Sequence, residues 1–565
     1  MSRRFSISVY IFTALFFGCF FLWPIYQILE GAFINANGQF TVSYVKEVFL
    51  NEVYVEGLLN ALGMAFFSTL FAMLIAVPLA RLSDRYNFPG KTVFMGLVLL
   101  PIMLPPFVGA IGIRQILGQY GSLNILLEKL HLQSGPLPID WLGGNGQFWG
   151  IIIVNALSLY PILYLNALAT LSNIDPAMEE AAQNLGCRRF RKFFKITLPL
   201  MRPGLFAGAT IVFIWSFTEL GVPLIFDYSR ITSVQIFKGL KDIGNSAFPY
   251  ALVVVMLCFS LLFYAIGKGL FGRNPFSMMA KASQAKEPKK PRPAGQAGCI
   301  FYFSIITFFA LLPHISVILI SFSSDWYGTI LPQSWTLHNY EIALSNALTI
   351  PSIKNSLFYA GAATVLNTAL GISIAFVLVR TKLPGRSILD TFSILPLAVP
   401  GLVMAFGYLA MTQEGKLFSF LNPTENPTIL LIIAYGIRKL PFMVRSAVSG
   451  LQQTSPTYEE AAQNLGCPPL KSTFKITLPL ILANLLAGGL LVFSQSMLEV
   501  SDSLILAQKQ QYYPITKAIY ELLKILGDGP YIACALGVWA MCFLAITILG
   551  ASLLLGKSLG SIFRV

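Results

Sequence analysis

The nine-residue string EEAAQNLGC occurs twice in this chain, at residues 179–187 and again at residues 459–467. At the same offset of 280 residues, segments 179–200 and 459–480 agree at 16 of 22 positions, and both end on KITLPL. Each copy is polar and charged but lies between long apolar runs. The chain is arranged around these two segments, which we name the first repeat loop (175–200) and the second repeat loop (455–480).

The composition is that of a membrane protein. Of the 565 residues, 55% are hydrophobic and 11% are charged, whereas a typical soluble domain has about 25% charged residues. Such a chain cannot cover a water-facing surface with polar groups. The net charge of +14 would also suit a nucleic-acid binder, but the basic residues lie between apolar runs, where orientation in a bilayer explains them. We therefore expect the chain to lie in a lipid bilayer and to bind no nucleic acid.

Twelve apolar runs are long enough to cross a bilayer as helices, since a span needs about 20 residues and open loops cannot cross lipid. The expected fold is therefore an all-α membrane protein with about twelve transmembrane helices. The runs are 9–30, 57–80, 92–113, 149–171, 204–226, 248–271, 298–321, 354–380, 388–410, 428–450, 481–506 and 532–556.

Lysine and arginine gather in every second loop, which predicts that both termini and both repeat loops are cytoplasmic. Residues 272–297 are rich in Pro, Ala and Lys and read as a linker. They divide the chain into a first unit (1–271) and a second unit (298–565) of six spans each. Because six is even, each unit starts and ends on the same side, so the units are parallel repeats.

Each repeat loop has the pattern of a short helix, a turn and a second helix. Asp175-Pro176 and Ser455-Pro456 are helix-start signals, and the glutamates that follow favour the positive end of a helix. Gly186 and Gly466 fit a helix stop. An apolar face on such a loop usually packs against a partner, or more simply against the protein's own spans, but packing alone would not require nine identical residues.

At these residues the chain resembles the inner-membrane permeases of bacterial ABC importers. The family pattern of EAA, three residues, Gly, nine residues, Ile, one residue and Leu-Pro is met twice in full, before the penultimate span of each unit. The resemblance implies the type I importer permease fold and makes the repeat loops coupling loops that dock on an ATP-hydrolysing subunit. The docking residues that it implies are Glu179, Glu180, Ala181, Ala182 and Gly186 in the first loop, and Glu459, Glu460, Ala461, Ala462 and Gly466 in the second.

ATP hydrolysis is expected on another chain, because no GxxxxGK[ST] phosphate loop occurs in this sequence. Two docking loops imply two ATPase subunits, which would hold ATP and Mg²⁺. For this chain we expect no bound cofactor, no metal site and no enzymatic activity of its own. The resemblance further implies a periplasmic substrate-binding protein as partner and the bacterial inner membrane as location.

Acidic residues inside the spans are candidates for the translocation path, because charge in a membrane is costly and usually functional. Glu219 lies in the fifth span and aligns at the offset of 280 with Glu499, which Asp502 follows one turn later. A symmetric pair of carboxylates would line a central cavity and attract or gate a cation. The structural alternative is that each glutamate caps a broken helix or pairs with a nearby polar group.

The fused form and the segment Thr218-Glu219-Leu220-Gly221 resemble ferric-iron importers most, so ferric iron is the expected substrate. Importers of thiamine, polyamines, phosphonate and sulfate or molybdate belong to the same group and stay open as alternatives. A secondary transporter of the 6+6 type, driven by an ion gradient, is the second alternative. Such a carrier would have no reason to present one docking motif twice.

Overall fold

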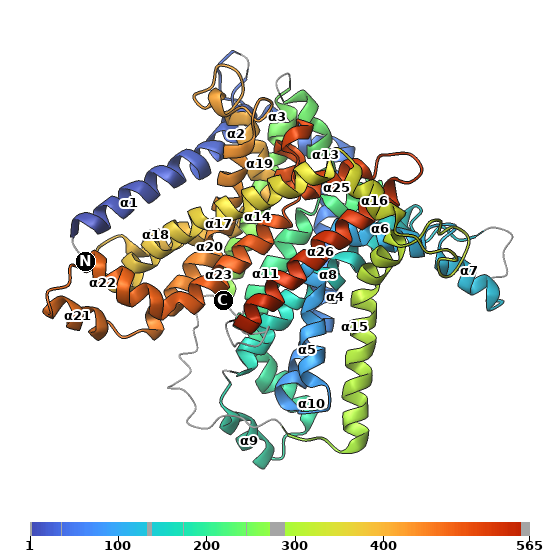
Figure 1. The fold of residues 1–565 in the computed structure, drawn as a ribbon, viewed down its shortest axis with the longest axis horizontal. Coiled ribbons are helices and arrows are strands. Elements are labelled where there is room, and N and C mark those ends of the chain that lie inside the picture. Colours follow the sequence, from blue (N-terminus) through green and yellow to red (C-terminus); the bar gives the residue numbers. More distant parts are fainter. Residues whose placement is uncertain are drawn as a thin grey trace.

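The computed structural model describes residues 3–35, 37–132, 138–172, 174–243, 246–271 and 289–554, and helices carry its architecture (Figure 1). The first unit contains α1 (Arg3–Phe17), α2 (Trp23–Phe33), α3 (Ser43–Leu50), α4 (Glu52–Arg85), α5 (Lys91–Leu99), α6 (Pro106–Leu117), α7 (Ser122–Lys129), α8 (Asn145–Ser172), α9 (Pro176–Asn184), α10 (Arg189–Lys192), α11 (Leu198–Phe217), α12 (Gly221–Ile225), α13 (Thr232–Gly239) and α14 (Phe248–Phe271).

The second unit repeats this order with two differences: α15 stands in the place of α1 and α2, and a 3-10 turn (Ser419–Leu421) stands in the place of α7. It contains α15 (Pro293–Ser321), α16 (His338–Ser345), α17 (Thr349–Arg380), α18 (Arg386–Ile394), α19 (Gly401–Met411), α20 (Thr428–Gln453), α21 (Thr457–Asn464), α22 (Pro469–Ser472), α23 (Leu478–Met497), α24 (Ser501–Leu506), α25 (Ile515–Leu522) and α26 (Gly529–Leu554). The duplication seen in the sequence thus extends to the order of the helices.

Most expected spans are single long helices. Within the described residues, nine helices are long and apolar enough to cross a membrane, or eleven if each of two bent pairs is one span. The bent pairs replace the expected straight runs 92–113 and 388–410, and their two arms meet at 97° and 99°. Proline explains both breaks, because Pro105 and Pro400 stand where the second arm begins and cannot continue a helix. The remaining expected run, 428–450, is helix α20, whose basic residues set it apart from the other spans.

The predicted linker is only partly described. Residues 272–288 of the predicted linker lie outside the described residues, and residues 293–297 belong to α15. The unit boundaries at 271 and 298 therefore stay a prediction, although α14 does end at Phe271.

The two units interlock through their first spans. Helix α2 of the first unit packs against α19 of the second, and α15 of the second packs against α6 of the first. Glycine permits both crossings: a Cβ atom on Gly407 would lie 2.9 Å from Cβ of Pro24, and one on Gly112 would lie 2.8 Å from the carbonyl oxygen of Pro313. One large cluster of buried apolar residues consequently includes residues of both units, with smaller clusters beside it.

Candidate functional site

The first helix ends in the same way in the two repeat loops, although α9 begins at Pro176 after the capping Asp175 and α21 begins at Thr457 after Pro456. Each of α9 and α21 is followed, two residues after its end, by a glycine in the left-handed region, Gly186 at φ +75° and Gly466 at φ +84°. In the first loop the Gly186 amide donates to the Gln183 carbonyl and the Cys187 amide to the Ala182 carbonyl, each at 3.0 Å. The second loop repeats both bonds at 3.0 Å, at residues shifted by 280. This pair of bonds is the Schellman motif, which closes a helix end when the next residue is glycine.

The paired glutamates of each loop have different surroundings. Glu179 accepts a hydrogen bond from the Thr197 hydroxyl at 3.0 Å, and Glu459 accepts one from Nε of Arg380 at 3.1 Å. The Arg380 side chain, only 10% exposed, also donates to the carbonyls that end α20. Glu180 and Glu460, by contrast, are exposed. The first glutamate of each pair therefore holds its loop in place, and the second one is presented to the outside.

Each loop also exposes apolar side chains next to that glutamate. Leu185 is 88% exposed and Leu465 is 90% exposed. Ala182 and Ala462 are buried and anchor the two short helices, whereas Ala181 and Ala461 are exposed. An exposed leucine on a short helix that projects from the bundle (Figure 1) is the kind of surface that a partner protein covers.

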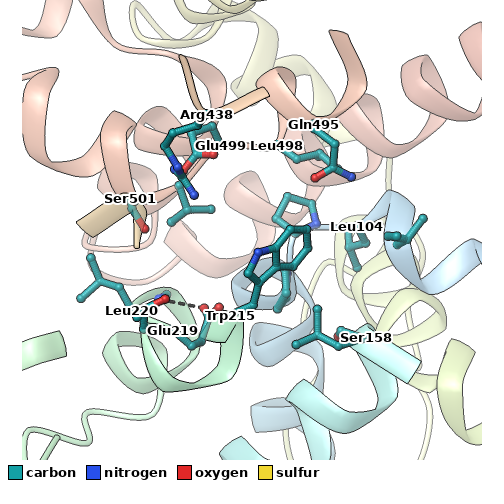
Figure 2. A pocket seen from close by; sticks show the side chains of 18 of the residues that line it. Leu104, Ser158, Trp215, Glu219, Leu220, Arg438, Gln495, Leu498, Glu499 and Ser501 are labelled. Carbon is teal, nitrogen blue, oxygen red and sulfur yellow. Dashed lines mark hydrogen bonds and ion pairs between the residues drawn. The ribbon is translucent and has the colours of Figure 1, made fainter. Parts of the chain in front are cut away.

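A central cavity of about 140 Å³ lies between the units, and both contribute to its walls. Figure 2 shows Glu219, Trp215 and Ser158 of the first unit facing Arg438, Glu499 and Gln495 of the second. The structure therefore brings together the two glutamates that the sequence singled out, at the boundary between the repeats. Asp502 lies behind this wall, fully buried.

Glu219 is a helix cap within its own unit. Its Oε1 atom accepts hydrogen bonds from the amides of Gly221 at 3.0 Å and Val222 at 3.3 Å, at the start of α12. Its backbone carbonyl accepts a bond from the Ser233 hydroxyl at 2.6 Å. This is the capping role that the sequence left open as the structural alternative.

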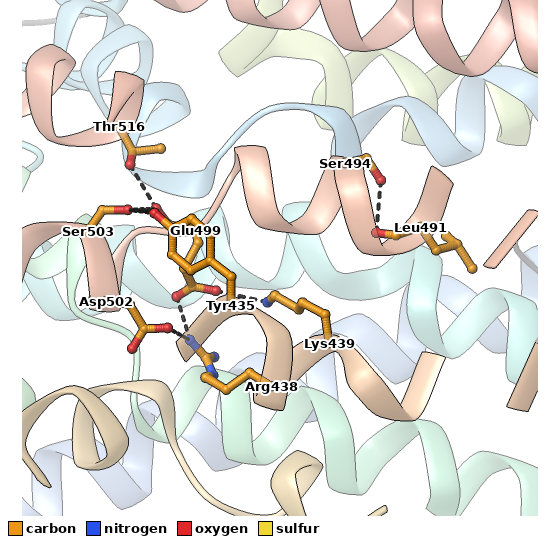
Figure 3. A network of polar contacts seen from close by, with 9 residues as sticks. All are labelled: Tyr435, Arg438, Lys439, Leu491, Ser494, Glu499, Asp502, Ser503 and Thr516. Carbon is orange, nitrogen blue, oxygen red and sulfur yellow. Dashed lines mark hydrogen bonds and ion pairs between the residues drawn. The ribbon is translucent and has the colours of Figure 1, made fainter. Parts of the chain in front are cut away.

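Glu499 belongs instead to a buried network of four charges (Figure 3). Its two oxygens pair with Arg438 at 2.5 Å and with Nζ of Lys439 at 2.8 Å, and Arg438 also reaches Asp502 at 3.0 Å. The charges balance, two positive against two negative, as buried ions require. The network ties the broken end of α23 and the start of α24 to α20.

The sequence interpretation missed Arg438 and Lys439, although both lie inside the expected span 428–450. Two adjacent basic residues within an apolar run were the signal that would have found them. At the offset of 280 they align with Ser158 and Leu159 of the first unit, which line the opposite side of the same cavity. The cavity is thus built by a duplicated fold but carries its cations on one side only.

Within the described ranges, no group of three or more His, Cys, Asp or Glu residues is arranged to hold a metal ion. The absence of a bound cofactor stays a prediction from the sequence.

Comparison with known proteins places both halves in one family. The model of the family described as binding-protein-dependent transport system inner membrane component matches residues 72–273 and 367–552. A ferric transport system permease protein of Actinobacillus pleuropneumoniae is 29% identical over 506 residues, which cover 87% of this chain and 69% of that protein. A putative ferric transport system permease protein of Haemophilus influenzae is 29% identical, with 82% and 70% covered. A probable molybdenum ABC transporter permease protein of Haloferax volcanii is 32% identical over 38% of this chain and 77% of that protein.

Proposed function

This chain belongs to the family of binding-protein-dependent transport system inner membrane components, and from this premise we propose that it supplies both permease units of one ATP-driven importer. It takes a substrate from a periplasmic binding protein and moves it into the cytoplasm by alternating access. The observation that carries the proposal is the repeated loop, which presents the same glutamate and leucine to the outside on both units.

The repeat loops act as the docking sites for two ATPase subunits, which bind ATP and Mg²⁺. Glu180 and Leu185 of the first loop, and Glu460 and Leu465 of the second, form the contact surfaces. Glu179 and Glu459 hold these surfaces in position by accepting hydrogen bonds from Thr197 of the first unit and Arg380 of the second unit. In this arrangement the loops lie in the cytoplasm, and so do both termini.

The central cavity is the translocation path in a closed state. Its volume of about 140 Å³ offers room for a small ion or a cluster of water molecules, so a larger substrate would need the two walls to separate. Glu219 would then attract a cation from the first unit's wall, whereas Glu499 on the opposite wall is held by Arg438 and Lys439. Ferric iron is the substrate favoured by the names of two relatives. The molybdenum-named relative keeps an oxyanion open, and thiamine, polyamines and phosphonate remain further alternatives.

The decisive experiment measures vanadate-sensitive ATP hydrolysis by the chain purified with its native partners, with and without a loaded binding protein. We expect hydrolysis to rise when the loaded binding protein is added. Recovery of active, gradient-driven transport with no ATPase attached would instead identify a 6+6 secondary transporter. Uptake of labelled ferric iron and of labelled thiamine by a deletion strain, with and without the restored gene, then tests the substrate. Restored uptake of thiamine alone would overturn the assignment to iron.

A further inference from the structure

A second cavity lies far from the central one, on the outer side of the bundle. It is an apolar groove of about 350 Å³ between α1 and α18, lined by Tyr10, Thr13, Ala14 and Phe17 on one side and Ile388 and Leu389 on the other. Helix α1 forms the edge of the molecule here (Figure 1). Ala14 and Ile388 are exposed, so the groove opens toward the surroundings of the bundle, which for these helices is the bilayer.

The equivalent place in the other half of the duplication is filled. There α15 packs against α5 through a cluster of aromatic rings. The ring centroid of Phe303 lies 5.2 Å from that of Phe88 and 5.7 Å from that of Phe94. Phe303 is completely buried. At the offset of 295 that relates Asn60 to Asn355, the two partner rings correspond to leucines, at positions 383 and 389.

Thr13 stands where α15 carries Phe303. The two helices can be aligned on the proline that each buries against a glycine of the other unit, Pro24 and Pro313. The π-helical turn Gly18–Leu22 adds one residue to α1, so Thr13 comes level with Phe303, and both are buried. The groove therefore lies where one of two related interfaces has Thr13 and leucines in place of the three rings, beside the remaining ring pair of Phe17 and Phe392.

The groove also contains polar groups that have no partner. The hydroxyls of Tyr10 and Thr13 are buried and make no hydrogen bond with any described residue. Thr13 as a whole is only 3% exposed. A buried donor without an acceptor destabilises the structure, so an occupant with hydrogen-bond acceptors is favoured over plain hydrocarbon. A positive charge stands at one end of the groove, because Arg386 begins α18 and interacts electrostatically with Tyr10.

We propose that this groove binds a glycerophospholipid of the surrounding membrane. One acyl chain fills the apolar space that the aromatic cluster fills in the other half. The ester oxygens accept hydrogen bonds from Tyr10 and Thr13, and the phosphate pairs with Arg386. Apolar tail, ester acceptors and negative phosphate occur in this order in a phospholipid, as the matching groups occur along the groove.

The test is native mass spectrometry of the full chain. The protein is measured once after purification in a mild detergent and once after direct release from the membranes of its host. Wild-type protein should retain a phospholipid, and Thr13→Phe, which restores the ring found at Phe303, should lose it. Leu15→Phe is the matched control, because it adds the same ring at a neighbouring α1 position that is 61% exposed. It should retain the lipid. Equal retention by Thr13→Phe and wild type would overturn the proposal, as would a polypeptide found in the groove.

A second measurement covers the case in which Thr13→Phe fails to fold. Wild-type protein is reconstituted with a phosphatidylglycerol that carries a diazirine in one acyl chain, and the crosslinked peptides are mapped. Crosslinks should concentrate on the peptides of α1 and α18 and should decrease in Arg386→Gln. Crosslinks spread evenly over all lipid-facing helices, unchanged by Arg386→Gln, would show that no specific site exists.

Discussion

At the scale of single residues, two adjacent glutamates in each repeat loop have separate tasks. Glu459 holds Arg380 in a nearly buried pair, so Glu459→Gln should lower the free energy of unfolding by about 1–3 kcal/mol. Glu460 is exposed, so Glu460→Gln should leave the unfolding temperature unchanged and weaken ATPase-subunit binding by about fivefold, which corresponds to about 1 kcal/mol. Thermal unfolding in detergent and a binding titration of the two variants check this division. If Glu460→Gln is the variant that unfolds early, the assignment of the two tasks is wrong.

The central glutamates should also respond differently to the same change. Glu499→Gln leaves Arg438 and Lys439 with one buried acid between them, and breaking a buried pair costs about 3–5 kcal/mol. Glu219→Gln keeps an oxygen that accepts from the same two backbone amides, so its cost should be about 1 kcal/mol. The unfolding temperature of each variant is compared with that of Glu425→Gln, an exposed control. Equal losses for both glutamates would contradict the asymmetry of the cavity.

At the scale of elements, the glycine turns decide whether each short helix is presented correctly. A Cβ atom on Gly186 or Gly466 would meet nothing within 4 Å, so a substitution there acts through backbone strain alone, about 1–2 kcal/mol for a left-handed residue. We expect Gly186→Val and Gly466→Val to weaken ATPase association while the protein stays inserted.

Gly328→Val provides the control for this prediction, because Gly328 has φ +64° and equally open surroundings but lies in neither repeat loop. Co-purification of the ATPase subunit with each variant is the measurement. Loss of the subunit from Gly328→Val to the same extent would show that general strain, not the loop, is responsible.

The elements also show what could be predicted from the sequence. Long apolar runs and the repeated string were enough for the helical class, the duplication and the loop turns, because these depend on local composition and glycine. The bends of the third and ninth runs depend on which proline breaks a span, and several prolines inside straight helices, such as Pro161 in α8, look the same in sequence. The Arg438 network could not be assembled because its members lie about 60 residues apart and only packing brings α20 to α24.

At the scale of the whole molecule, duplication followed by divergence explains the differences between the halves. The order of the long helices repeats, yet cations line only one side of the central cavity, and the ring cluster around Phe303 has no counterpart at the level of Thr13. The backbone has thus been kept while side chains at equivalent places have changed. Fusion in one chain permits this, because each unit always meets the same partner and need not be complementary to itself.

The same reasoning applies to the two docking sites, which we expect to differ in their dependence on salt. The first loop exposes Arg188 where the second loop has Pro468, whereas the exposed Arg191 and Lys471 at the next matched basic position carry the same charge. Exposed charges steer and strengthen association at low ionic strength and are screened within about 8–10 Å at physiological salt. ATPase binding through the first loop should therefore fall more steeply as salt is raised.

This difference can be measured on chains in which one loop is disabled, Gly466→Val for the first site and Gly186→Val for the second. The affinity for the ATPase subunit is titrated for each chain at several salt concentrations, and the slopes are compared. Replacing Arg188 by glutamine in the Gly466→Val chain should bring the first slope down toward the second, because it removes an exposed charge that has no counterpart at Pro468. Identical slopes before that replacement would mean that the duplicated loops remain equivalent in binding despite their different charges.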